Sequence, residues 1–244
     1  MKGKVWCAFA VLAAFALMAS LAAADDPWAK RSAKEWSRED VDKVMKDSPW
    51  GREIATGYTY KKESEENKST GQKSIISKTD RGDQQPTDFA TVLWWSAKTT
   101  RRAYVRMAQL SGAQISDEQV QKFAESAMPD HVVSVIRGGK MVEVSAKLSA
   151  DELKKAAWLE SPRLKKKILP EDVVVVKDEM GKAQQINFHF AREFEGQPTV
   201  TGEDKKLIFK FKLPKDPKTT VDKAELFDVT FQPAKMVVAG AADY

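Results

Sequence analysis

Residues 185–191 read QINFHFA and residues 205–213 read KKLIFKFKL, and these two stretches decide the fold class. In each stretch large apolar residues take every second position, and these residues are Ile186, Phe188, Phe190, Leu207, Phe209 and Phe211. Successive side chains of a strand point to opposite faces, so a period of two predicts strands with one buried face.

The same kind of short apolar run recurs through the last third of the chain. Residues 173–177, 224–232 and 236–239 are separated by Gly, Pro and Asp, which is typical of antiparallel strands joined by turns. An earlier run, DFATVLWWSA at residues 88–97, predicts a buried strand. Its adjacent Trp94 and Trp95 are expected to point to opposite faces of the sheet.

Capping signals between these strands predict helices. Ser116 with Gln119 and Ser149 with Glu152 are capping boxes, in which a hydroxyl and a carboxyl or amide satisfy free backbone N–H groups. The pattern predicts three helices, over residues 100–110, 116–128 and 149–160. Gly138-Gly139 predicts a two-residue hairpin turn between strands at 131–137 and 140–148.

Residues 25–60 are interpreted as a small helical module rich in Trp. Ser37 is a good N-cap for a helix that runs to about Asp47. Trp28, Trp36 and Trp50 surround this helix and are the candidates for aromatic contact. Because the module has few aliphatic residues, docking of these indoles on the main body is favoured over stacking on a ligand.

The polar composition of residues 61–85 predicts a loop or linker, and residues 86–244 are expected to form the main domain. We therefore expect an α+β fold in which a few helices pack on a mostly antiparallel sheet. The C-terminal part is β-rich, and the small N-terminal helical module packs on this core.

Residues 1–24 have the pattern of a secretory signal peptide. Lys2 and Lys4 precede an apolar run, and Ala22-Ala23-Ala24 offers the small residues that signal peptidase accepts. We expect cleavage after Ala24 and a periplasmic or secreted protein, with an uncleaved membrane anchor as the alternative.

Export with cleavage would remove the single Cys of the 244 residues, Cys7. A cysteine-free mature chain excludes disulfides, thiol nucleophiles and Cys–zinc sites. The formal net charge of +5, which falls to +3 without Lys2 and Lys4, is too small to imply a nucleic-acid partner. The sequence contains no Gly-rich nucleotide loop, HExxH, GxSxG or EF-hand pattern, so no cofactor and no metal is expected.

Two other groups of residues are candidates for function. The densest basic run, Arg163, Lys165, Lys166 and Lys167, could meet anionic lipid head groups or acidic envelope polymers, or it could be a solvated helix end. His189, with Arg192 and Glu193 nearby, could act as a general base. For both His189 and His131, however, the pattern favours a surface or strand-edge position without catalysis.

Several segments together resemble a family of uncharacterised exported bacterial proteins. The most recognisable is WSREDVDKVMKDSPW at residues 36–50, which ends in Ser-Pro-Trp. The others are LWWSAKTTRRA at 93–103, Phe188-His189-Phe190, GEDKK at 202–206 and FQPAKMV at 231–237. Some relatives sit beside or carry a GWxTD domain, whose literal motif is not in this sequence. The resemblance implies export and an accessory role, and it implies no catalytic residues.

These observations lead to one preferred function and two alternatives. We expect a non-enzymatic cell-envelope protein that binds a partner protein or an envelope polymer. The first alternative is a cofactor-free hydrolase of envelope glycans or peptides that uses carboxylates. The second is a peripheral membrane-binding protein that uses the basic run. The sequence identifies no catalytic residue and no oligomeric state.

Overall fold

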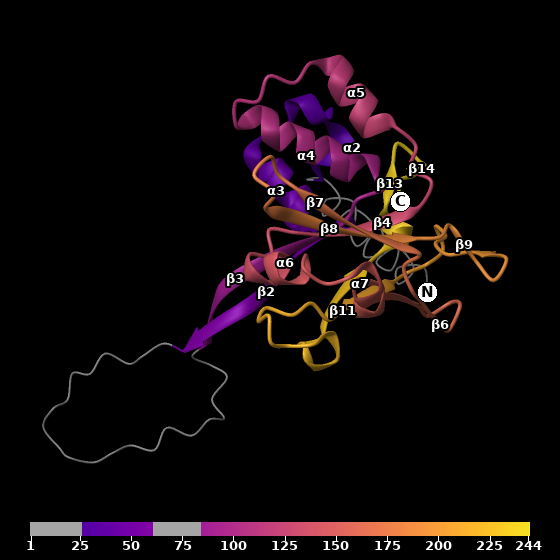
Figure 1. Ribbon diagram of the computed structural model, residues 1–244. Helices are drawn as coiled ribbons and strands as arrows, with labels where there is room; N and C mark the ends of the chain where they lie inside the picture. Colours follow the sequence, from indigo (N-terminus) through magenta and orange to yellow (C-terminus); the bar gives the residue numbers. More distant parts are fainter. Residues whose placement is uncertain (1–25, 61–83) are drawn as a thin grey trace, which may run out of the picture.

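Two antiparallel sheets and a group of helices form layers (Figure 1). The computed structural model describes residues 26–60 and 84–244, so the predicted signal peptide and almost all of the predicted polar loop lie outside the described residues. The larger sheet has the order β1-β2-β3-β4-β8-β7. Its strands are Asp47–Ser48, Gly51–Tyr60, Gln84–Trp94, His131–Ile136, Ala183–Phe190 and Asp172–Lys177.

The smaller sheet has the order β12-β11-β5-β6, with strands Phe227–Phe231, Leu207–Phe211, Ala157–Ser161 and Lys166–Ile168. Two short hairpins complete the strands of the described part: β9 with β10 (Glu193–Phe194, Gln197–Pro198) and β13 with β14 (Val237–Val238, Ala241–Ala242). The predicted mostly antiparallel α+β fold is confirmed.

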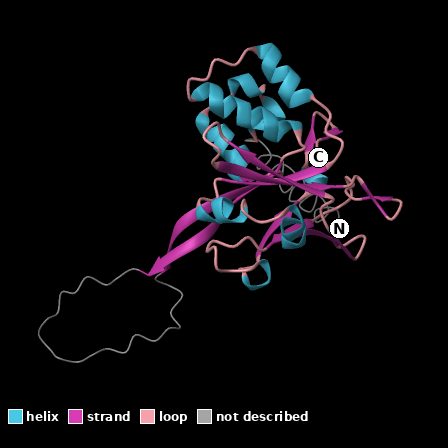
Figure 2. Ribbon diagram, viewed as in Figure 1, coloured by secondary structure: helices cyan, strands magenta, loops and turns pink. Residues whose placement is uncertain are grey.

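Six α-helices lie in the described residues, in two groups (Figure 2). The first group is α2 to α5, which lie together on one side of the larger sheet: Pro27–Lys30, Arg38–Lys46, Lys98–Leu110 and Asp117–Glu125. On the other side are α6 and α7, Lys140–Ser145 and Ala150–Ala156. The capping boxes at Ser37, Ser116 and Ser149 all form as predicted. None of these helices combines the length and hydropathy that crossing a membrane requires.

The main core fills the space between the two sheets. Phe188 of β8 packs on Phe209 of β11, with 5.5 Å between the ring centroids, and Phe209 stacks on Phe211 at 5.3 Å. These rings are fully buried. The alternation that predicted two half-buried strands therefore identifies the residues by which the sheets pack together.

A second core lies between the larger sheet and the first helix group. Val41, Val44 and Met45 of α3 pack there against Leu93 of β3 and Trp95, which directly follows β3. Trp94, in contrast, belongs to the core between the sheets. The prediction that the adjacent indoles point to opposite faces is confirmed. Trp94 packs in the core between the sheets, and Trp95 packs in the core under the first helix group.

Two local predictions are wrong. Gly138-Gly139 is not a hairpin turn, because β4 ends at Ile136 and residues 140–145 form α6. Met141, Val142 and Ser145 form the buried face of this helix and have helical spacing. The β-branched valines of the segment favour strands, and the prediction followed them. The helix predicted to run to Glu160 ends at Ala156, and residues 157–161 form β5 with buried and half-buried residues in alternation.

The Trp-bearing N-terminal segment shares the main sheet with the rest of the chain. Its last ten residues form β2, which pairs with β3 over its whole length and extends with it away from the body (Figure 1). Gly57 sits where this pairing shifts register, and a side chain there would meet the Asp88 carboxylate at 2.6 Å. The segment is therefore joined to the sheet by backbone pairing as well as by its indoles.

Candidate functional site

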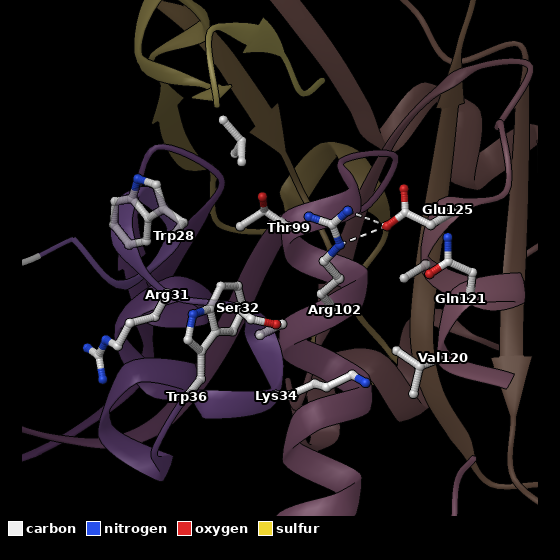
Figure 3. A pocket seen from close by; sticks show the side chains of 13 residues that line it. Trp28, Arg31, Ser32, Lys34, Trp36, Thr99, Arg102, Val120, Gln121 and Glu125 are labelled. Carbon is white, nitrogen blue, oxygen red and sulfur yellow. Dashed lines mark hydrogen bonds and ion pairs between the residues drawn. The ribbon is translucent and has the colours of Figure 1, made fainter. Parts of the chain in front are cut away.

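A cavity of about 290 Å³ lies between the N-terminal segment and the pair α4–α5 (Figure 3). Trp28 and Trp36 lie on one side of it, and Arg102 with Glu125 lies on the other. Ser32, Thr99 and Gln121 add uncharged polar groups, and Arg31, Lys34, Val120, Ala124 and Val238 complete most of the lining. The N-terminal segment, α4, α5 and β13 therefore form one concave site together.

The three N-terminal tryptophans have different roles at this cavity. Trp28 is half-buried and stands edge-on to Trp50, with ring centroids 5.3 Å apart. Trp50 is fully buried behind it, and its Nε1 donates a hydrogen bond to the Asp243 carbonyl at 2.7 Å. The buried Trp36 donates from Nε1 to the Pro27 carbonyl at 3.2 Å. Trp28 is thus the indole with a surface left for a ligand, while Trp36 and Trp50 hold the wall in place.

The charges around the cavity are arranged as ion pairs. Arg31 makes two hydrogen bonds to Asp40, at 2.7 and 2.6 Å, and Lys34 pairs with Asp117 on α5. Arg102 donates from Nε to Glu125 at 2.8 Å. Because each cation faces an acid, the rim is strongly polar but carries little net charge.

Glu125 is held ionised at this site. Partial burial by itself would raise the pKa of Glu125, but hydrogen bonds and charge from Arg102 and Lys98 outweigh it and lower the pKa. The Lys98 ammonium lies 3.0 Å from the second carboxylate oxygen. A carboxylate fixed in its charged form by two cations suits binding and positioning better than proton transfer, which needs a pKa near the working pH.

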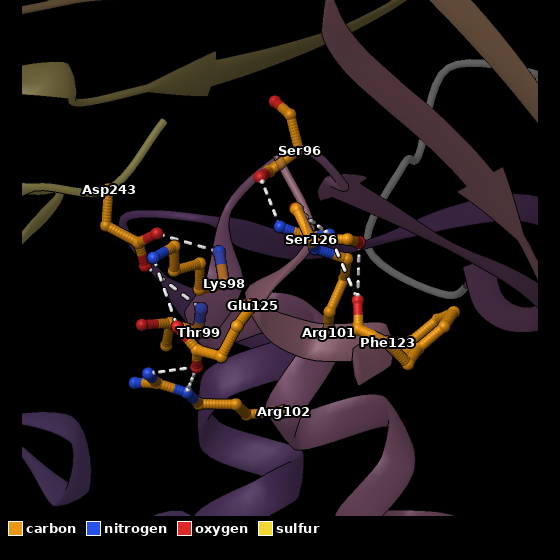
Figure 4. A network of polar contacts seen from close by, with 9 residues as sticks. All are labelled: Ser96, Lys98, Thr99, Arg101, Arg102, Phe123, Glu125, Ser126 and Asp243. Carbon is orange, nitrogen blue, oxygen red and sulfur yellow. Dashed lines mark hydrogen bonds and ion pairs between the residues drawn. The ribbon is translucent and has the colours of Figure 1, made fainter. Parts of the chain in front are cut away.

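A network of polar contacts fixes the walls of the cavity (Figure 4). The Asp243 carboxylate accepts hydrogen bonds from the Lys98 and Thr99 backbone N–H groups, at 2.7 and 3.0 Å. It therefore caps the N-terminus of α4, where free N–H groups and the helix dipole favour an anion. Arg101, on the same helix and 3% exposed, donates to the carbonyls of Phe123 and Ser126 at 3.1 and 2.8 Å. These bonds hold the end of α5 against α4.

The basic run spans the turn between β5 and β6 and the first two residues of β6, so the alternative of a helix end does not apply. Arg163 donates to the Asp204 carboxylate at 2.9 Å, Lys166 pairs with Glu195, and the Lys167 ammonium lies 4.9 Å from the centre of the Trp158 ring. Lys165 occupies the turn with φ of 53° and is exposed. Most of this charge is therefore engaged in contacts within the protein.

The two histidines are in very different surroundings. His189 is half-buried, and its Nδ1 lies 3.2 Å from the Asp130 carboxylate, while Arg192 donates to the carbonyls of Met128 and Pro129. His131 is 2% exposed, in a strand flanked on both sides, so the predicted surface or edge position is wrong for it. The cause is the strand order, which places β4 between β3 and β8.

The structure brings Trp28 and Trp36 to the cavity with Trp50 behind them, and it places the basic run elsewhere. Sequence reasoning missed Arg102, Glu125 and Asp243 as site residues. The capping box at Ser116 predicted α5, but nothing local indicated where α5 packs. Within the part of the chain that the structure describes, no group of three His, Cys, Asp or Glu residues is placed to hold a metal ion.

Comparison with known proteins adds no assignment. The chain matches no protein-family model, and neither the comparison with curated proteins nor that with solved structures gave a significant match. The resemblance to exported bacterial proteins therefore stays a prediction.

Proposed function

We propose that this chain is an exported, non-enzymatic cell-envelope protein that binds a partner protein or an envelope polymer in the cavity beside Trp28. The observation that carries the proposal is the position of Trp28: a half-buried indole that lines a cavity opposite a fixed ion pair. Indoles with one accessible side are common at binding sites because they offer a large apolar surface at little entropic cost.

The size and chemistry of the cavity limit what it can take. Its volume of about 290 Å³ is at the lower end of the range for ligand sites. One side chain of a protein partner or one unit of a polymer fits this space better than a large cofactor. The indoles favour an apolar or ring-shaped group, and the paired charges of Arg102 and Glu125 favour a ligand that also carries hydrogen-bonding groups.

Binding is favoured over hydrolysis by the state of the acid in the cavity. Glu125 is the carboxylate among the residues that line it, and Arg102 and Lys98 hold this group ionised. Carboxylate hydrolases need a second acid at a defined distance, with one of the two protonated. In place of two carboxylates, the cavity lining offers the Arg102–Glu125 ion pair, which can bind polar groups of a ligand.

The binding proposal is tested with the mature protein immobilised and exposed to envelope extracts. Any retained component is purified, and its affinity is measured for wild type, Trp28→Ala and Trp158→Ala. Trp158 is the matched control, because it is also a half-buried indole but lies on β5, outside the cavity lining. We expect Trp28→Ala to weaken binding about tenfold or more, while Trp158→Ala leaves it unchanged. Equal affinities for all three proteins would reject the cavity as the binding site.

Export is tested separately, by expressing the full chain with its N-terminal segment and determining the N-terminus of the product. The pattern at Ala22-Ala23-Ala24 predicts a mature protein that begins at Asp25 and is recovered in the periplasm or the medium. A product that keeps residues 1–24 and stays with the membrane would support the anchor alternative instead.

A further inference from the structure

Strand β7 leaves one side of the larger sheet open. Within the described residues it is the last strand of the sheet and pairs with β8 alone. Its other edge therefore presents backbone N–H and C=O groups that have no strand partner. Such an edge can accept a further strand unless a protein protects it.

The side chains of β7 favour association at this edge, because two of them are apolar and exposed. Residues 173–176 are four consecutive valines, and the strand contains no proline. Val173 and Val175 pack toward the core between the sheets. Val174 and Val176 point to the opposite face, where they are 41% and 39% exposed. Exposed valines beside an open edge carry a free-energy cost that burial in an interface would remove.

The charges that flank the valines indicate which strand fits there. Glu171 precedes β7 and Lys177 ends it, and both are exposed. If a second copy of β7 lies antiparallel to the first, about a two-fold axis through Val174, residues equally far from Val174 stand opposite each other. Glu171 of each copy then faces Lys177 of the other. Glu171 and Lys177 are therefore complementary in charge across this pairing.

We propose that two copies of this chain associate through β7, which continues the six-stranded sheet from one copy into the other. In this register Val174 opposes Val174 of the second copy on one face and Val173 opposes Val175 on the other, while Asp172 opposes Val176. A two-fold axis uses the same surface on both subunits, as in most dimers. Cross-strand pairs of β-branched residues and of opposite charges are those that stabilise antiparallel strands.

Sedimentation velocity of the mature protein over a range of concentrations tests this dimer. Val174→Lys places two like charges at the axis and is expected to weaken dimerisation at least about tenfold. The matched control is Val237→Lys, because Val237 is also an exposed strand valine, 40% exposed, but lies in β13. A wild-type protein that stays monomeric at about 100 μM, or a dimer that tolerates Val174→Lys, would overturn the proposal.

Charge reversal tests the register without touching the buried part of the strand. Glu171→Lys and Lys177→Glu should each weaken the dimer, because each places like charges opposite one another. The double variant restores both pairs with their signs exchanged, so we expect it to dimerise about as well as wild type. A double variant as weak as either single variant contradicts the register, and circular dichroism confirms that each variant is folded.

Discussion

Protonation of His131 in the unfolded chain should destabilise the folded protein as the pH falls below about 6.5. The ring is 2% exposed at the start of β4, a strand inside the larger sheet, and it lies 5.5 Å from the ring of Trp94. Burial, with a smaller contribution from the positive charge of Arg192, lowers the pKa of His131 from 6.5 to about 3. The folded state therefore keeps this imidazole neutral, whereas the unfolded chain protonates it near pH 6.5.

The sign and size of the effect follow from this difference. Because the pKa is lower in the folded state, the stability that the neutral ring contributes is complete above pH 6.5. It is lost progressively as the pH falls from 6.5 toward 3, by about 1.4 kcal/mol for each pH unit. Between about pH 7.5 and about pH 5, protonation of the unfolded chain should lower the free energy of unfolding by about 2 kcal/mol.

Urea denaturation of wild type and His131→Phe at these two pH values isolates this contribution. Other groups titrate alike in both proteins, so wild type should lose about 2 kcal/mol more than the variant between the two conditions. His189→Gln is the matched control: it removes the half-buried ring beside Asp130 but leaves His131 in place, so the loss should persist in it. Equal losses in wild type and His131→Phe would show that the folded state accepts the proton, and the reasoning would be wrong.

Three further substitutions test the contacts that shape the cavity and the fold. Asp243→Ala should lower the free energy of unfolding by about 1 kcal/mol, and Asp243→Asn by less, as measured by urea denaturation, because the carboxylate caps α4. Arg101→Met should cost about 2–4 kcal/mol and speed amide exchange in α5, since the carbonyls of Phe123 and Ser126 lose the donor that holds them to α4. Gly138→Ala should cost about 1–3 kcal/mol in the same urea assay, because its Cβ would lie 2.8 Å from Val142; Gly202→Ala, which has space, should stay within about 0.5 kcal/mol.

The parts of the fold that the sequence predicts are those that depend on neighbours along the chain. The alternation around Phe209 and the capping boxes involve residues two or three positions apart, and the structure has both. The hairpin predicted at Gly138-Gly139 fails because local turn and strand preferences compete there with tertiary packing. Gly138 lies against the side chains of Met141 and Val142, so the close approach of α6 to the preceding chain requires a residue without a side chain.

The burial of His131 and the cavity could not be predicted, because both depend on contacts between residues that are distant in the sequence. The strand order decides that β4 is central, and this order depends on pairings with β3 and β8, which are distant in the sequence. Likewise, the Asp243 carboxylate reaches Lys98 across 145 positions of the chain. No local pattern at either end indicates the other, so the tryptophans were recognisable as candidates while their polar partners were not.

The contacts of Asp243 also separate two ways in which binding at the cavity can be lost. The Asp243 side chain caps α4. The Asp243 carbonyl accepts a hydrogen bond from the Trp50 indole, and the Asp243 N–H donates one to the carbonyl of Met236, just before β13. It thereby joins three elements that surround Trp28 without itself lining the cavity. Asp243→Ala should then weaken stability and binding together, because the walls loosen. Trp28→Ala should weaken binding with a smaller change in stability, because it removes only the half-exposed surface that a ligand would cover. If both variants changed binding and stability in the same proportion, Trp28 would be a structural residue like Trp50, and the ligand would have to be sought elsewhere on the protein.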